Sequence, residues 1–368
     1  MDKKRAIFTS VLFLLLIFGF AVWHLVLPDK ATSQAERREL AQAPAVNSEA
    51  VFSGKFSAEL EDYLLDQFPL RQEFVSGHKL LRYYVLGQRG LDNMWIQGNS
   101  AFEAEKLKET DVQYAAHGIA KIADSMPESV NLYYAVIPDK GAYAADQGQP
   151  KMDYDRLFAI LEETLPEDMT RIDLWDTLSF EDYYDTDLHW KQERIYPVAE
   201  TLAEAMGTEL LPFENFQPNT LAPFYGSYFS RSGKPLEPDE LTFMTSRFTG
   251  SAKVTGKDFN GVIQVYAPQL LSGMDGYDVY LSGVQSLLTI ENRNATTDRE
   301  LIIFRDSFGS SITPYFMGAY RKITLIDLRS PIDWWNYVNL TNQDVLFLYS
   351  GKILNNGSAL IFKTAAEE

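Results

Sequence analysis

Apolar runs that alternate with helical stretches place the strongest constraint on the fold of this chain. Five short runs indicate buried strands, at residues 131–138, 171–175, 300–304, 323–328 and 345–349. Helical spacing of apolar residues separates several of them, at residues 111–125, 153–165 and 192–206. Strands that alternate with helices build a sheet whose strands are mostly parallel. We therefore expect an α/β domain with its active residues on loops at the carboxyl ends of the strands.

The segments outside this pattern differ in character. Residues 29–56 are polar with little periodicity, which predicts a stalk. A helical pattern follows over residues 57–82, with a break at Pro69. Residues from about 211 to 290 carry Tyr, Phe and Gly in short alternating runs, which predict a β-rich insertion. The expected organisation is a tip and apolar helix over residues 1–28, a stalk over 29–56, and one α/β domain over 57–368 that contains the insertion.

An apolar stretch over residues 6–27 follows Lys3, Lys4 and Arg5. Its length suits one membrane-spanning helix, which needs about 20 residues, and the basic residues before it keep the N-terminus in the cytoplasm. A cleaved signal peptide is the alternative, although its apolar region usually has about 7–15 residues and no A-x-A site follows directly here. We expect an uncleaved, single-pass anchor in a bacterial cell membrane, with the rest of the chain outside the cytoplasm.

Charge and composition exclude several classes of function. The formal net charge of the 368-residue sequence is -18, whereas nucleic-acid binding rewards a basic surface. The sequence has no cysteine, which excludes disulfides, thiolate metal sites and a cysteine nucleophile. A neutral or only locally charged substrate is therefore expected, and no nucleic-acid partner.

A serine follows one of the predicted strands closely. Ser307 comes after the apolar run over residues 301–304 and before Gly309, where a turn into a helix is expected. This position presents the hydroxyl at the edge of a sheet and offers backbone N–H groups to a developing oxyanion. Serines after strands are more often turn or cap residues, so this segment alone favours the structural role over the nucleophile.

An aspartate and a histidine two positions apart offer the partners that such a serine needs. Asp187 and His189 point to the same side of an extended segment, so the carboxylate can orient the imidazole and leave its other nitrogen for a hydroxyl. His78 and His117 lie in helical patterns without a neighbouring acid in a loop. A structural histidine packed against Trp190 is an equally good interpretation of the pair.

A metal site is a rival use of the same segment. Asp185, Asp187 and His189 place oxygen and nitrogen ligands at alternate positions. A catalytic zinc needs three strong protein ligands, and the sequence has no second histidine cluster. We therefore expect neither a metal nor a cofactor.

Ordered motifs along the chain are similar to those of one protein family. They lie at residues 36–41 with Pro44, and at 66–71, 136–140, 187–190, 224–227, 305–308 and 326–329. On these motifs the chain resembles the DHHW-motif branch of the SGNH hydrolase-like alginate O-acetyltransferase group, over most of the sequence after the apolar stretch. The eponymous motif departs at one position, where Leu188 replaces its first histidine. The roles considered for Asp187, His189 and Ser307 do not depend on that position.

The resemblance implies an SGNH-hydrolase-like, flavodoxin-like α/β fold in which the Asp–His pair precedes the serine in the chain. It implies Ser307 as nucleophile, His189 as base and Asp187 as the acid that orients the base, in agreement with the roles expected from the residues. Further candidates for oxyanion stabilisation or substrate contact are the N–H groups near Phe308, the turn at Gly283, Arg305 and Trp190.

Members of this family acetylate exported polysaccharides with acetyl groups received from a multi-spanning membrane O-acyltransferase. The expected function is therefore a membrane-anchored, extracytoplasmic O-acetyltransferase that acts on an exported or cell-surface polysaccharide through an acetyl-serine intermediate. One alternative is a glycan acetyl esterase, which differs only in using water as the acceptor. The second is a non-catalytic glycan-binding or scaffold subunit of a polysaccharide export complex, in which the Ser307 hydroxyl is dispensable.

Overall fold

The computed structural model describes residues 3–33, 36–87, 93–232, 234–257, 261 and 263–365. Contacts divide the chain into two compact units, one over residues 1–89 with 233–235 and the other over 90–232 with 236–368. The expected boundary at residue 57 differs from this division. The helical pattern over residues 57–82 therefore belongs to the first unit.

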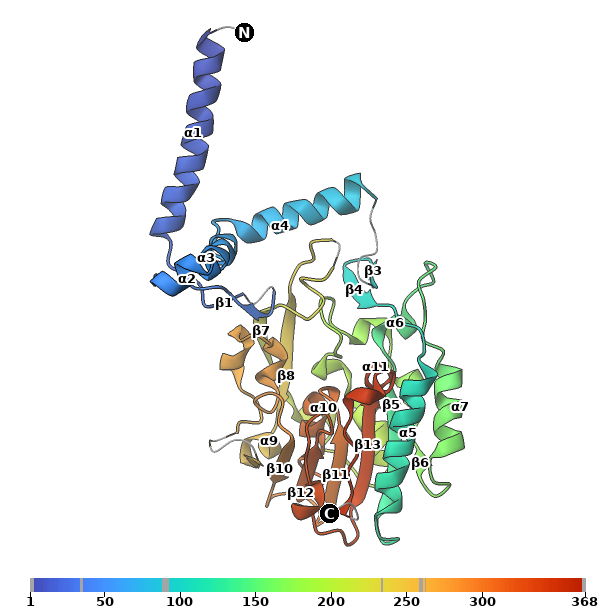
Figure 1. Cartoon of the computed structure of the whole chain (residues 1–368). Coiled ribbons are helices and arrows are strands. Elements are labelled where there is room, and N and C mark those ends of the chain that lie inside the picture. The colour runs from blue at the N-terminus through green and yellow to red at the C-terminus, as the bar shows by residue number, and fades with distance from the viewer. Residues whose placement is uncertain are drawn as a thin grey trace. The chain divides into compact units, whose positions relative to one another are not determined.

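The first unit consists of one long apolar helix and several short elements (Figure 1). These are α1 (Lys3–Val26), β1 (Thr32–Ser33), β2 (Arg38–Glu39), α2 (Ser48–Phe52), α3 (Lys55–Asp66), α4 (Arg71–Leu80) and a π-helical turn at Leu81–Val85. Across the described part of the chain, α1 is the one helix long and apolar enough to cross a membrane. The break predicted at Pro69 is confirmed, because α3 ends before it and α4 begins after it.

The segment predicted as a stalk is tied to the end of α3. Asp66 forms an ion pair of 2.5 Å with Arg38 and accepts a hydrogen bond of 2.8 Å from the N–H of Ala41. The hydrogen bond from the Arg38 guanidinium holds the pKa of the Asp66 carboxyl below its usual range. Two of the motifs that carry the family resemblance, at residues 36–41 and 66–71, therefore pair with each other.

The second unit is built on a seven-stranded sheet with the strand order β6-β5-β13-β11-β12-β10-β9 (Figure 1). Its strands are β5 (Asn131–Ile137), β6 (Thr170–Arg171), β9 (Lys253–Gly256), β10 (Leu287–Glu291), β11 (Glu300–Arg305), β12 (Lys322–Ile326) and β13 (Asp344–Ser350). Neighbouring strands from β6 to β12 in this order are parallel, whereas β10 pairs antiparallel with both β12 and β9. The predicted, mostly parallel α/β sheet is confirmed.

Helices cover both faces of this sheet. They are α5 (Glu109–Asp124), α7 (Tyr154–Thr164), α8 (Tyr196–Ala205) and α10 (Phe308–Phe316). Leu301 and Ile303 of β11 belong to the core cluster that includes α8 and α10. Ile302 and Phe304 belong to the cluster that includes α5 and α7, because alternate strand residues point to opposite faces. All four side chains are buried, so the core on both sides fixes the register of β11 and the position of the loop that follows it.

The predicted insertion over residues 211–290 is only partly separate from this sheet. An antiparallel hairpin of β7 (Gln217–Phe224) and β8 (Asp239–Thr245) lies outside it. The strands β9 and β10, by contrast, form the antiparallel edge of the main sheet. Local sequence does not reveal this membership, since it depends on pairing with β12, which lies far along the chain.

The strand predicted at residues 171–175 is shorter in the structure. Only Thr170–Arg171 pairs with β5, because the Asp173 carboxylate accepts a hydrogen bond of 2.9 Å from Trp175 N–H and turns the chain. The remaining short elements of this unit are β3 (Met94–Gln97), β4 (Ser100–Glu103), α6 (Lys140–Tyr143), α9 (Arg247–Ser251) and α11 (Gly351–Leu354).

Candidate active site

Ser307 lies at the carboxyl edge of the sheet, after its central strand. It is the residue directly before helix α10. Asp306 fixes the turn: its Oδ1 accepts a hydrogen bond of 3.0 Å from the N–H of Phe308. Its Oδ2 accepts bonds of 2.9 and 2.7 Å from the N–H and hydroxyl of Ser350 at the end of β13. The serine is thereby held where two neighbouring parallel strands end, as expected for an active residue of this fold class.

The imidazole of His189 bridges the carboxylate of Asp187 and the hydroxyl of Ser307. Its Nδ1 lies 2.5 Å from Asp187 Oδ1, and its Nε2 lies 2.6 Å from Ser307 Oγ. A hydrogen bond of 3.1 Å from Tyr184 N–H to the His189 carbonyl oxygen closes the tight loop that contains Asp187 and His189. The three residues predicted as acid, base and nucleophile thus meet, although 118 positions separate His189 from Ser307.

Asp187 is a fully buried carboxylate surrounded by donors. Its Oδ1 also accepts a bond of 2.9 Å from His189 N–H, and its Oδ2 accepts one of 2.6 Å from Ser227 N–H. Burial raises the pKa of this carboxyl, but the neighbouring imidazole and the hydrogen bonds outweigh burial, so the pKa lies well below its usual range. Asp187 is therefore ionised and can stabilise a positive charge on His189.

An aromatic stack holds the His189 ring. Tyr277 lies face to face with it, with ring centroids 3.7 Å apart and an angle of 6° between the planes. Tyr277 OH donates to Ser311 Oγ over 2.7 Å, and Trp190 Nε1 donates to the same oxygen over 2.8 Å. Trp190, a candidate for substrate contact, is fully buried and contributes to this support instead.

A buried lysine ties down the loop that carries Asp187. Lys140, at the start of α6, donates to the carbonyl oxygens of Tyr184 (2.5 Å), Asp185 (3.2 Å) and Asp187 (3.3 Å) and to Ser100 Oγ (3.0 Å). Burial lowers the pKa of Lys140 to about 7. Its amine provides hydrogen-bond donors for three carbonyl groups of one loop, which stabilises the conformation of that loop.

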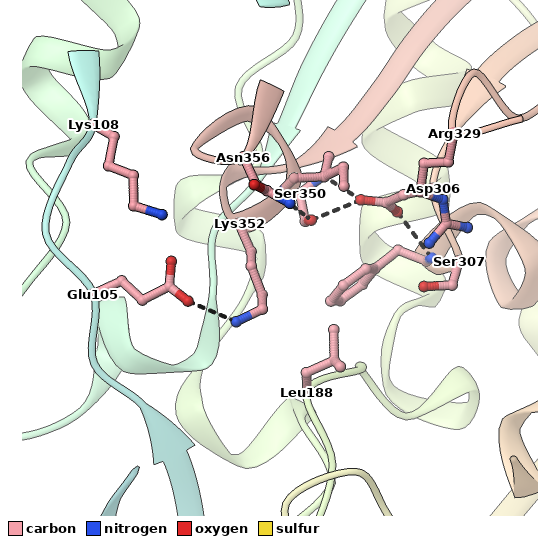
Figure 2. A pocket seen from close by; sticks show the side chains of 11 residues that line it. Glu105, Lys108, Leu188, Asp306, Ser307, Arg329, Ser350, Lys352 and Asn356 are labelled. Carbon is pink, nitrogen blue, oxygen red and sulfur yellow. Dashed lines mark hydrogen bonds and ion pairs between the residues drawn. The ribbon is translucent and has the colours of Figure 1, made fainter. Parts of the chain in front are cut away.

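A cavity of about 420 Å³ opens beside Ser307 (Figure 2). Its lining residues are Glu105, Lys108, Leu188, Asp306, Ser307, Phe308, Arg329, Ser350, Lys352, Ile353 and Asn356. Lys352 forms an ion pair of 2.8 Å with Glu105, and Arg329 forms one of 2.5 Å with Asp327. Leu188, at the position where the chain departs from the family motif, points into the cavity (Figure 2). Charged and amide groups around an accessible hydroxyl suit a polar ligand with several hydrogen-bonding groups.

Of the further contact candidates, Phe308 lines this cavity, whereas Trp190, Arg305 and Gly283 do not. The Phe308 N–H donates to Asp306 within the turn, so it is engaged there rather than free for an oxyanion. Arg305 is fully buried and interacts with Asp327 at 3.7 Å. Gly283 lies in a turn at φ +90°, next to Asp278.

Four residues that build this site receive no role from sequence reasoning. Lys140, Ser227 and Arg329 lie in motifs that carry the family resemblance. The motifs therefore mark these positions, but they do not indicate what each residue contacts. Tyr277 lies in the predicted insertion and has no sequence signal at all, since aromatic residues there are numerous.

The arrangement suits acyl transfer. His189 Nε2 can take the proton of Ser307 while Oγ attacks an ester carbonyl, and Asp187 can hold the imidazole in the tautomer that makes this possible. Asp187 and His189, the rival metal ligands, bond to each other instead. Across the ranges that the structure describes, no three His, Asp or Glu side chains form a group that could hold a metal ion.

Comparisons with known proteins find relatives among solved structures only. The chain matches no protein-family model and no curated protein. It is similar to the structure of a DHHW family protein from Eubacterium siraeum, with 20% identity, a TM-score of 0.60, and coverage of 73% of this chain and 98% of the other. It is also similar to Bacillus cereus PatB1, with 17% identity, a TM-score of 0.60 and coverage of 73% and 99%. A PatB1 structure with a sulfonyl adduct matches with 17% identity, a TM-score of 0.58 and coverage of 71% and 95%.

The similarity to these structures and the topology of the sheet show that the chain has an SGNH-like α/β fold. An apolar helix precedes this fold at the N-terminus. Within that class its structural relatives include a DHHW family protein, so the branch predicted from the ordered motifs is confirmed at the level of the fold.

Gly226 lies against the backbone of the Asp187 loop. Its N–H donates to Thr186 Oγ1 over 3.0 Å. A Cβ atom added to it would lie 2.3 Å from the Thr186 carbonyl oxygen and 2.5 Å from Asp187 Cβ. Contacts this short require the backbone of one segment to move, so any larger residue would displace Asp187.

Gly226→Ala is therefore expected to lower the hydrolysis of p-nitrophenyl acetate by about 100-fold, since a displacement of about 1 Å at reacting groups costs this much. The rate would be measured together with thermal unfolding, so that misfolding is recognised. Gly250→Ala in α9 is the matched control, because nothing lies within 4 Å of its added Cβ. Wild-type turnover by Gly226→Ala would contradict a rigid Asp187 loop.

Proposed function

We propose that this chain is a membrane-anchored O-acetyltransferase that modifies an exported or cell-surface polysaccharide outside the bacterial cytoplasm. The observation that carries the proposal is the hydrogen-bonded series from Asp187 through His189 to Ser307, with distances of 2.5 and 2.6 Å, beside a polar cavity. The motif resemblance to the DHHW branch supports the acetyl group and the glycan acceptor. The apolar helix α1 supports single-pass anchoring by residues 1–28.

In the first half of the reaction, Ser307 Oγ attacks the carbonyl carbon of the donor's acetyl ester while His189 Nε2 takes the hydroxyl proton. The ionised Asp187 stabilises the imidazolium that forms. Helix α10 begins directly after Ser307, so the positive end of its dipole favours the negative charge on the tetrahedral oxygen. The intermediate collapses, the donor's oxygen leaves with the proton from His189, and Ser307 carries an acetyl ester.

In the second half, a glycan hydroxyl enters the cavity and gives its proton to His189 Nε2 as its oxygen attacks the acetyl carbonyl. Collapse of this intermediate breaks the bond to Ser307 Oγ, which recovers the proton. The charged and amide groups of Glu105, Lys352 and Asn356 line the cavity and can bind the other hydroxyls of the sugar.

The acetyl donor is a multi-spanning membrane O-acyltransferase in this proposal, because the resemblance assigns that partner to the family. Anchoring by α1 keeps the acceptor enzyme at the same membrane as such a donor. A donor partner also explains how an extracytoplasmic enzyme receives an activated acetyl group.

The direct test is covalent trapping at Ser307. The detergent-solubilised full chain would be treated with phenylmethanesulfonyl fluoride, or briefly with p-nitrophenyl acetate and then acid, and digested for mass spectrometry. An activated serine is expected to carry the sulfonyl or acetyl group on the peptide that contains Ser307. Labelling should vanish in Ser307→Ala and fall strongly in His189→Ala. No adduct, or one that persists in Ser307→Ala, would overturn the proposal and favour a scaffold role.

The same preparation separates transferase from esterase. Acetylated protein would be mixed with short oligosaccharides, and the acetyl group would be counted in the sugar and in free acetate. Transfer to sugar at millimolar acceptor is expected, although water is far more concentrated, because the cavity positions the acceptor hydroxyl. Release as acetate alone, with every glycan offered, would assign the chain as an acetyl esterase.

A further inference from the structure

The helices that follow α1 expose large apolar side chains. Between residues 64 and 86 the most exposed are Leu65, Phe74, Leu81, Tyr84, Val85 and Leu86, at 50–70%. Single exposed apolar residues are common on soluble proteins, but a clustered set marks a surface that contacts something else.

These side chains are organised on α4 and its π-helical continuation. Phe74, Leu81 and Val85 recur seven and four positions apart, which places them on one face of a helix, together with the exposed His78. That face is exposed, whereas Ser76 on the opposite side is half-buried. The helix is thus turned with its apolar face outward, the reverse of a helix on a water-soluble domain.

The sequence of α1 sets the depth of its residues in a bilayer. The apolar stretch begins at Ala6, directly after the basic residues, and a span of about 20 residues then ends near Leu25. At about 1.5 Å per residue, Phe20 lies roughly 7 Å inside the outer end of that span.

The α3–α4 connection contacts α1 at this depth. The ring of Phe68 stacks on Phe20 with centroids 5.3 Å apart and 5° between the planes. The ring of Phe74 lies 6.2 Å from Phe20 and 5.9 Å from Phe68. One turn further out, His24 Nδ1 lies 3.1 Å from the carbonyl oxygen of Gln67. Because Phe20 lies within the span, Phe68 and Phe74 reach the acyl-chain region as well.

We propose that the end of α3 and α4 with its π-helical continuation lie in the outer interface of the bilayer, with the face of Phe74, Leu81 and Val85 toward the acyl chains. This inference rests on the proposed anchoring by α1. The contact with Phe20 selects lipid rather than a partner protein, because it fixes Phe68 and Phe74, and with them the start of α4, at a depth where lipid is the surrounding medium. A spanning helix combined with an interfacial one also limits rotation of the chain about α1.

The test uses the absence of cysteine from the sequence. Single cysteines can be introduced into the full chain and spin-labelled without removing any native thiol. Leu81→Cys and Val85→Cys report on the apolar face, and Ser76→Cys reports on the opposite side of α4. Phe13→Cys in α1 is the lipid reference, and Glu128→Cys, at an exposed position of the second unit, is the water reference.

Each labelled chain would be placed in nanodiscs of phosphatidylethanolamine and phosphatidylglycerol without any partner protein. Collision rates with oxygen, which enters acyl chains, would be compared with those of a water-soluble nickel chelate. The oxygen-to-nickel ratio at Leu81 and Val85 is expected to approach that at Phe13 and to exceed the ratios at Ser76 and Glu128 several-fold.

Water-like ratios at Leu81 and Val85, with a lipid-like ratio at Phe13, would overturn the interfacial helix and leave a partner protein to cover that face. A water-like ratio at Phe13 would overturn the anchoring itself, together with the inference built on it. Neither result bears on the chemistry of Ser307, which the trapping experiment tests separately.

Discussion

Ser307→Ala is expected to lower the turnover of p-nitrophenyl acetate by roughly 10³- to 10⁶-fold, because the reaction loses the atom that forms the acetyl ester. The wild-type reaction uses the Oγ atom that lies 2.6 Å from His189 Nε2, and its removal closes the route through an acyl ester. Initial rates would be measured with the full chain in detergent over a range of substrate concentrations.

Ser310→Ala is the matched control for this change. Ser310 is a buried serine in the first turn of α10, and it lies outside the Asp187–His189–Ser307 series. Its turnover should stay close to that of the wild type. A residual rate in Ser307→Ala similar to that of Ser310→Ala would remove Ser307 from the reaction and favour the scaffold alternative.

Asp187→Asn is expected to lower kcat by about 10⁴-fold with little change in fold. An amide at this position can donate to His189 Nδ1, which moves the imidazole proton to Nε2 and removes the acceptor for the Ser307 hydroxyl. Because the pKa of the Asp187 carboxyl lies well below its usual range, the wild-type carboxylate is charged throughout the pH range of the assay, so the wild-type rate should show no loss from protonation of Asp187 over that range.

Asp185→Asn removes a charge from the same loop without touching His189 and serves as the control. Its kcat should fall by less than about threefold, as for a charge outside the reacting groups. Thermal unfolding of both variants shows whether the loop is intact. A kcat of Asp187→Asn within tenfold of the wild type would contradict the role of Asp187 as the orienting acid.

Much of the fold follows from the sequence because its central strands are long and apolar. The strands β5, β11, β12 and β13 lie at the predicted runs, since each is buried on both faces and has no polar alternation. The edge strands differ: β6 has only two residues, β10 joins the sheet by pairing with β12, and β9 joins it by pairing with β10. Short edge strands depend on tertiary partners, which local sequence does not specify.

The residues of the candidate site also differ in how far the sequence predicts them. Asp187, His189 and Ser307 can be predicted because few residue types can perform their chemistry and because the family motifs contain them. Lys140 cannot be assigned a role from the sequence, since a lysine is nearly always exposed and only the folded chain surrounds this one with carbonyl oxygens. The oxyanion donors expected among the N–H groups near Phe308 stay a prediction, although the Phe308 N–H itself donates to the neighbouring Asp306 carboxylate.

The cavity beside Ser307 draws its walls from separate parts of the chain. The atoms that make and break bonds belong to the end of β11 and the Asp187 loop, whereas the facing wall comes from the segment before α5 and from α11 with the residues after it, including Lys108 and Lys352 (Figure 2). Under the proposed function, substitutions in that wall would alter which sugar is accepted without moving Asp187, His189 or Ser307. Divergence in acceptor choice would then be accessible to evolution in single steps, each of which leaves these three residues in place.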